Sequence, residues 1–105
     1  LMLKSSKLFI DKNKNIKFNK VNFDLISNHQ LINYKNIPET EFINQLSLQI
    51  HSPVMWSDTI KKIAEIGVSK FIEIGPKKTL LNLIPKNFDA EKISITSSED
   101  INNYV

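Results

Sequence analysis

Residues 67–84 have the sequence GVSKFIEIGPKKTLLNLI, which decides the class of the fold. The apolar run Phe71–Ile74 predicts a buried strand, and the glycine–proline pair after it predicts a turn. A short helix is expected next, ended by Pro85. Gly67 stands where the helix before the strand needs a left-handed C-terminal cap. Strands that alternate with helices in this way are typical of a parallel sheet covered on both faces.

Upstream of this stretch, residues 38–66 predict two helices separated at Ser52-Pro53. Serine is a good N-cap, and proline is tolerated at the first helical position. The first helix begins near Pro38 and has apolar residues at helical spacing at Phe42, Ile43, Leu46 and Ile50. The second has an apolar stripe that includes Trp56, Ile60, Ile63 and Ala64, and packing is the expected role of this stripe.

The outer segments complete the prediction. Leu1–Lys14 favours a helix, and Ile16–Asn28 favours a short buried strand around Leu25 that ends at Ser27-Asn28-His29. Lys92–Thr96 predicts a third strand, and Ser97 or Ser98 can cap a last helix through Tyr104. The expected order is helix, strand, helix, helix, strand, helix, strand, helix. We therefore predict an α/β fold.

Composition narrows the possible chemistry. The chain has 105 residues, which suits one domain, and it has no cysteine, which excludes disulfides, thiolate zinc sites and a cysteine nucleophile. All 14 basic residues are lysines, so the two-pronged recognition of carboxylates by arginine is absent. Residues 1–20 hold six lysines and one acidic residue, so the basic excess is local. No apolar run approaches the ~20 residues of a membrane helix, and we expect no membrane partner.

Two histidines, His29 and His51, are the candidates for a catalytic base. Ser52 follows His51 directly, but adjacent residues do not face one another, so this adjacency does not indicate a dyad. We expect both histidines to be surface or loop residues. The histidines and scattered carboxylates lack the spacing of metal ligands, so we expect no metal and no cofactor.

Lysines suggest two anion sites. Lys77 and Lys78 follow the glycine–proline turn, where free N–H groups at a helix start attract anions. The phosphate-loop spacing is absent, so we favour a tight strand-to-helix turn with solvated lysines. The N-terminal lysines are interspersed with Phe9, Phe18 and Phe23, which superficially resembles a nucleic-acid stacking surface. No recognised nucleic-acid module is visible, and we favour a solvated face with no nucleic-acid partner.

Three runs, in order, resemble the malonyl-CoA:acyl-carrier-protein transacylase family. Residues 49–56, QIHSPVMW, are similar to the family's Q-L-x-x-P-V-x-W. Gly67-Val68, followed by FIEIGP at 71–76, resembles G-V-x-x-F-x-E-[IV]-G-P-G-K-x-L. Residues 26–28, ISN, resemble the S-N or N-N that ends a strand. The resemblance implies that residues 1–105 are an incomplete, C-terminal portion of the family's hydrolase-like parallel-sheet subdomain.

The resemblance also implies a reaction. The family's serine, in a G-x-S-x-G turn, takes malonyl from coenzyme A with a histidine as general base, and an arginine pairs with the malonyl carboxylate. The phosphopantetheine thiol of acyl carrier protein then accepts the group, in fatty-acid biosynthesis. The expected partners are malonyl-CoA, acyl carrier protein and the rest of the transacylase domain. The nucleophilic serine, base histidine and substrate arginine are not in this chain, so we expect it to be inactive alone. The expected compartment is the cytoplasm of a bacterium or the plastid of a plastid-bearing eukaryote.

Two residues match positions near the family's reacting groups. Gln49 resembles the glutamine whose carbonyl accepts a hydrogen bond from the catalytic imidazole, and the matching histidine would lie just upstream of Leu1. Asn28, at the end of a predicted strand, is expected to contact the residues that surround the reacting groups and not the reacting groups themselves. Lys77 occupies a position that is usually glycine in the family, and a positive φ there would strain it.

Two other functions remain open. The first is an acyltransferase domain of a polyketide or fatty-acid synthase, which would carry a different acyl group. The second is a small non-catalytic module that binds anions or nucleic acid through Lys77, Lys78 and the N-terminal lysines.

Overall fold

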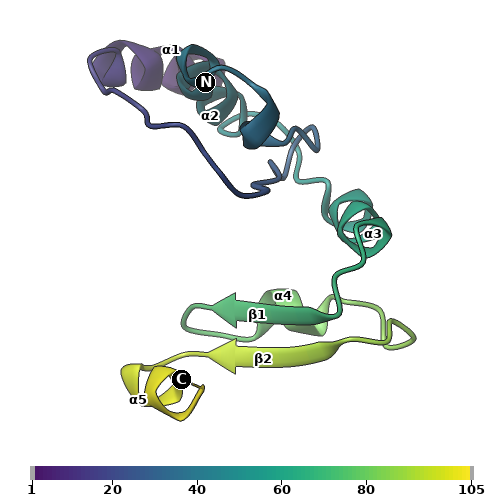
Figure 1. Cartoon of the computed structure of the whole chain (residues 1–105). Helices are drawn as coiled ribbons and strands as arrows, with labels where there is room; N and C mark the ends of the chain where they lie inside the picture. Colours follow the sequence, from purple (N-terminus) through teal and green to yellow (C-terminus); the bar gives the residue numbers. More distant parts are fainter. Residues whose placement is uncertain (1, 105) are drawn as a thin grey trace. The chain divides into compact units, whose positions relative to one another are not determined.

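The structure, a computed structural model, describes residues 2–104 and has a mixed α/β fold (Figure 1). Leu1, the first residue of the predicted N-terminal helix, lies outside the described residues. The elements in order are α1 (Met2–Asn13), the 3-10 turns η1 (Tyr34–Asn36) and η2 (Glu39–Glu41), α2 (Phe42–Leu48), α3 (Trp56–Glu65), β1 (Lys70–Ile74), α4 (Thr79–Asn82), β2 (Glu91–Ile95) and α5 (Ser98–Tyr104).

The chain divides into two compact units, residues 1–59 and residues 60–105, with the division inside α3. In the first unit, α1 lies against α2, as the Ser6 hydroxyl donates a hydrogen bond to the carbonyl of Ser47 at 2.9 Å. Both serines are buried. The Ser6 hydroxyl is the side chain that bonds across the contact, whereas the Ser47 hydroxyl donates to the Asn44 carbonyl in its own helix. The hydrogen bond from Ser6 attaches α1 to the C-terminal half of α2.

Three aromatic rings form the other core contact of this unit. Phe42 meets Tyr34 edge-to-face with ring centroids 5.2 Å apart, and it meets Phe18 in the same manner at 5.7 Å. Tyr34 and Phe42 are both 5% exposed. Such edge-to-face packing favours one defined arrangement of the rings. It therefore joins the extended segment before residue 20 to η1 and the start of α2.

The strand predicted within Ile16–Asn28 is wrong. Ile26 forms only an isolated antiparallel bridge with Asn33, and Phe23 is 60% exposed. The backbone bonds locally instead, since the Ser27 N–H donates to the Ile32 carbonyl at 2.8 Å. Leu31, with φ 58°, makes the tight turn that allows this return. A strand needs a neighbour for its backbone groups, and the sequence alone could not show that this segment pairs with its own turn.

The second unit is built on two parallel strands, which confirms two of the three predicted strands. β1 and β2 pair in register from Lys70 opposite Glu91 to Ile74 opposite Ile95. The connection between the two strands contains α4, which begins at Thr79. The Glu73 carboxylate accepts hydrogen bonds from the N–H groups of Leu80 at 3.1 Å and Leu81 at 2.9 Å. The carboxylate thereby satisfies two amides at the start of α4 that have no partner within the helix.

The expected burial of β1 is not found. The alternation along the strand places Ile72 and Ile74 on one face, and Ile74 is 76% exposed. Parallel sheets are normally covered on both faces and contain more strands. The apolar sequence of β1 is thus typical of a larger sheet than the two strands described here, which is why the sequence predicted a buried strand.

Turns follow the sequence closely, whereas several helix ends are shifted: α2 begins at Phe42 instead of near Pro38, and α4 ends at Asn82, before Pro85. Gly67 has φ 92° after α3, as predicted for a left-handed cap. Lys77 is not among the described residues with positive φ, so its replacement of glycine causes no backbone strain there. Ser52-Pro53 separates the two helices, but α3 starts later, at Trp56. α2 ends at Leu48, before Ile50.

Among residues 2–104, the helices are too short or too polar for any of them to cross a bilayer.

We predict that Glu73→Ala loosens α4, because the N–H groups of Leu80 and Leu81 lose their acceptor. The free energy of unfolding should fall by about 1 kcal/mol, and amide exchange of Leu80 and Leu81 should accelerate in NMR. Glu65→Ala, which removes an exposed carboxylate at the end of α3, is the matched control. Equal exchange rates in both variants would refute the capping role.

The carboxylate of Asp100 should titrate below its usual range. The Thr96 N–H and the Thr96 hydroxyl each donate to it at 2.9 Å, and these bonds lower its pKa from 3.8. Because the pKa is lower in the folded state, the stabilisation is complete above pH ~4 and is lost as the pH falls through the folded value. A carbon-detected NMR titration measures this, and Thr96→Val should raise the pKa. A pKa at the ordinary value in the native chain would contradict the prediction.

Candidate functional site

A cavity of about 460 Å³ in the first unit contains both residues that the family resemblance selected. Apolar side chains form much of its wall. Its polar lining residues are Asn19, Ser27, Asn28, Tyr34 and Gln49. Concave sites with a few convergent polar groups on an apolar wall are the usual form of ligand pockets. The fold therefore brings Asn28 and Gln49, which lie 21 positions apart in the sequence, to the same cavity.

Gln49 follows the last residue of α2 and is oriented by a tyrosine. Its side-chain Nε2 donates a hydrogen bond to the hydroxyl of Tyr34 at 3.3 Å. With the NH₂ end of the amide on Tyr34, the carbonyl Oε1 is the remaining acceptor of the side chain. No hydrogen bond to Oε1 occurs within the described part of the chain. The amide is thus held at one end and can accept a donor at the other.

Tyr34 is buried, and its surroundings affect its acidity. Burial raises the pKa of the Tyr34 phenol above 10.0, and the hydrogen bond from Gln49 lowers it by a smaller amount. The phenol is therefore neutral at physiological pH and can accept from the Gln49 amide. No motif in the sequence marks Tyr34, so the sequence does not predict its role. Only the return of η1 onto α2 places it beside Gln49.

Hydrogen bonds on both sides position Asn28, one to the side chain of its neighbour Ser27 and one to its own backbone carbonyl. The Ser27 hydroxyl accepts from the Ile32 N–H at 3.0 Å, which shapes the turn that follows Asn28. The Asn28 carbonyl accepts from the Met55 N–H at 2.6 Å, just before α3. Asn28 itself is exposed, and its predicted role remains a prediction.

The end of α2 that precedes Gln49 lies beside the first half of α1. The Ser6–Ser47 hydrogen bond fixes this arrangement, and Ser6 is within about two turns of the start of α1. A residue upstream of α1 must approach Gln49 if the predicted contact with an imidazole is to form. The placement of Ser6 and Ser47 is compatible with such an approach, and the contact itself stays a prediction.

The two histidines have different environments. His51 is exposed, as expected, and no hydrogen bond links it to Ser52 in the described structure. His29 lies in a turn, within the expectation of a surface or loop residue, but its side chain is buried, at 5% exposed. Both of its ring nitrogens lack a partner among residues 2–104. The turn at 27–30 carries the ring inward, and nothing in the local sequence indicated this. Among the same residues, no three His, Asp or Glu side chains gather as a metal-binding group.

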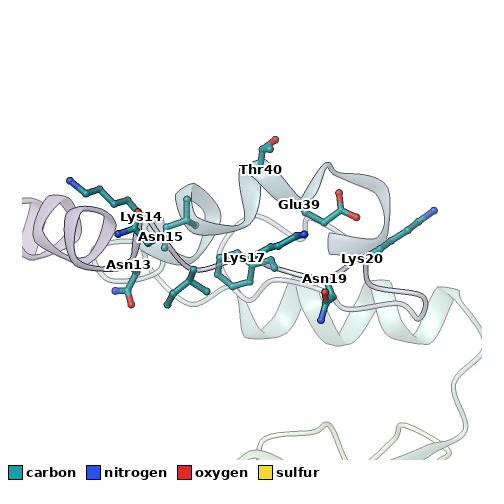
Figure 2. A pocket seen from close by; sticks show the side chains of 11 residues that line it. Asn13, Lys14, Asn15, Lys17, Asn19, Lys20, Glu39 and Thr40 are labelled. Carbon is teal, nitrogen blue, oxygen red and sulfur yellow. The ribbon is translucent and has the colours of Figure 1, made fainter.

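The N-terminal lysines line a second cavity, of about 650 Å³, that includes Lys14, Lys17 and Lys20. Figure 2 shows the side chains of Lys14 and Lys20 extending away from each other at opposite ends of this cavity. The carboxylate of Glu39 also lies on its lining. Charges that diverge into solvent around a carboxylate do not converge on one anion, so this surface has the character of a solvated basic face.

The turn with Lys77 and Lys78 does not offer backbone N–H groups to an anion at Leu80 and Leu81. The Glu73 carboxylate already accepts from these two N–H groups. This arrangement agrees with the preference for a tight turn that the spacing gave. Lys78 itself stands at the start of α4.

Comparison with known proteins gives a consistent set of relatives. The chain is 32% identical over 92 residues to a malonyl CoA-acyl carrier protein transacylase of Buchnera aphidicola, a match that covers 88% of this chain and 28% of the relative. The transacylase of Haemophilus influenzae is 32% identical over 91 residues, covering 85% of this chain and 28% of the relative. The transacylase of Staphylococcus aureus is 35% identical over 77 residues, a match that covers 71% of this chain and 25% of the relative. No family profile and no solved structure matches the chain.

The chain thus spans little more than a quarter of the length of the curated relatives it matches. By sequence, this chain is a relative of malonyl CoA-acyl carrier protein transacylases and corresponds to a segment of them.

Proposed function

We propose that residues 1–105 are the C-terminal part of a malonyl-CoA:acyl-carrier-protein S-malonyltransferase of fatty-acid biosynthesis. The complete enzyme would move malonyl from coenzyme A to the phosphopantetheine thiol of acyl carrier protein. One observation carries the proposal. Gln49 and Asn28, selected from the family motifs, line one cavity in which Tyr34 leaves the Gln49 carbonyl open to a donor.

Within this proposal, Gln49 is a positioning residue. Its Oε1 accepts the N–H of the catalytic imidazole, which fixes the ring in the tautomer whose other nitrogen removes the serine proton. The same bond stabilises the imidazolium that forms after proton transfer. The Tyr34 hydroxyl holds the amide so that its carbonyl, and not its NH₂ group, faces the ring.

The partner of this chain is the rest of the transacylase domain. Exposed apolar side chains on β1, among them Ile72 and Ile74, support this assignment, because an isolated two-stranded parallel sheet leaves them in water. The remainder would add strands to a hydrolase-like sheet and supply the serine, the histidine and the arginine. The bacterial origin of the relatives supports the cytoplasm as the compartment.

The proposal predicts that the purified chain has no malonyl transfer activity by itself and gains it when the upstream remainder of the transacylase is added. The gain is expected because the two parts together complete both the sheet and the catalytic groups. The measurement is the increase in mass of acyl carrier protein on malonylation, followed by mass spectrometry. Transfer by the chain alone, or a remainder whose activity does not depend on the chain, would count against the proposal.

In the complete transacylase, Gln49→Ala should lower kcat about 10- to 100-fold, less than the loss of a general base. Tyr34→Phe should lower it by a smaller factor, because the amide stays but is no longer held. The two effects should be less than additive in the double variant, since both act through one contact. Gln30→Ala, an exposed amide, is the control. A Gln49→Ala variant as active as Gln30→Ala would exclude the positioning role.

A further inference from the structure

A small cavity in the second unit gathers three lysines that are distant in the sequence. Lys78 at the start of α4, Lys86 in the connection after α4 and Lys92 on β2 line a space of about 280 Å³. No acidic side chain is among its described lining residues. All three lysines are exposed. Like charges placed near one another repel, so three lysines that line one cavity favour the binding of an anion there. The cavity is separate from the Gln49 site and lies in the other unit.

Ser94 gives an independent indication of a ligand. It lines the same cavity, two residues after Lys92, so both side chains point to the same face of the sheet. Its hydroxyl oxygen is buried and has no hydrogen-bond partner within residues 2–104. Buried hydroxyls nearly always have a partner, so an unpaired one requires an explanation. A bound anion that accepts a hydrogen bond from the Ser94 hydroxyl supplies that explanation.

The remaining lining suits a small polar ligand. Asn82 adds an amide that can donate hydrogen bonds, and Leu81 and Ile84 form an apolar base. Glu73 lies opposite Ser94 in the sheet register, and its carboxylate accepts hydrogen bonds from two N–H groups of α4. That carboxylate is therefore occupied, and three lysines outnumber it. The volume of about 280 Å³ lies just below the range of ordinary ligand sites, about 300–1,000 Å³, as suits a small ligand.

We propose that this cavity binds one phosphate group, either inorganic phosphate or the phosphate of a monoester. Lysine ammonium groups bind phosphate as point charges, with no need for the planar geometry of arginine. A phosphate dianion has enough oxygens to accept from the three lysines and the Ser94 hydroxyl together. The site does not depend on the proposed transferase function, and its test involves no activity measurement.

The test is a titration of the ¹⁵N-labelled chain with sodium phosphate at constant ionic strength, with sodium chloride as the balancing salt. The backbone amides of Asn82, Lys92 and Ser94 should shift along saturable curves, with a Kd of about 1 mM. A parallel titration with glycerol 3-phosphate distinguishes the two sources, because tighter binding of the ester assigns the site to a phosphorylated metabolite. Tighter binding of phosphate assigns it to the free ion. Shifts that stay linear, or that chloride reproduces, overturn the proposal.

Two variants make the result specific to the cavity. The triple substitution K78Q/K86Q/K92Q should weaken phosphate binding about tenfold or more, whereas K4Q/K7Q/K12Q on α1 removes the same charge and should change it less than twofold. Ser94→Ala keeps the net charge and should weaken binding about threefold. It also decides the question if the triple variant does not fold. Equal weakening by both triple variants, or unchanged binding in Ser94→Ala, overturns the site.

Discussion

The parallel pairing of β1 and β2 is the constraint on which the second unit depends. Parallel strands cannot be joined by a tight hairpin and need a crossover of a dozen or more residues. Residues 75–90 make that crossover with only a four-residue helix, too short to be stable by itself. The Glu73 carboxylate ties the helix to β1 through the N–H groups of Leu80 and Leu81. The same connection carries Lys78 and Lys86 to the face of Lys92, so the basic cavity is a consequence of the crossover.

The first unit depends on contacts between side chains more than on regular pairing. The rings of Phe18, Tyr34 and Phe42 pack edge-to-face, and the Ser6–Ser47 hydrogen bond joins α1 to α2. These contacts shape the cavity that holds Asn28 and Gln49. Tyr34 takes part in both the packing and the orientation of Gln49. A residue that serves the core and also fixes a polar amide couples the stability of the unit to the geometry of the candidate site.

Two facts support the proposal that the chain is part of a larger protein: β1 exposes apolar side chains, and the chain matches only a part of the length of its relatives. Ile72 and Ile74 have the sequence character of a buried parallel strand, yet they face water in the described structure. The relatives extend well beyond the segment that this chain matches. An apolar face of this kind is stable when further strands or helices cover it. Both facts support the proposed transferase, in which the chain would supply the scaffold and the orienting glutamine and the remainder would supply the nucleophile.

The sequence alone determined what depends on local chemistry. It determined α1, β1, α4, β2 and α5, the boundary at Ser52-Pro53 and the cap at Gly67, because periodicity, proline and glycine act within a few residues. The motifs also selected Gln49 and Asn28. Only the tertiary structure decided that residues 16–28 form no strand, that His29 is buried, that Tyr34 holds Gln49, and that Lys78, Lys86 and Lys92 meet. Each of these depends on which distant segment becomes a neighbour, and no local pattern encodes that choice.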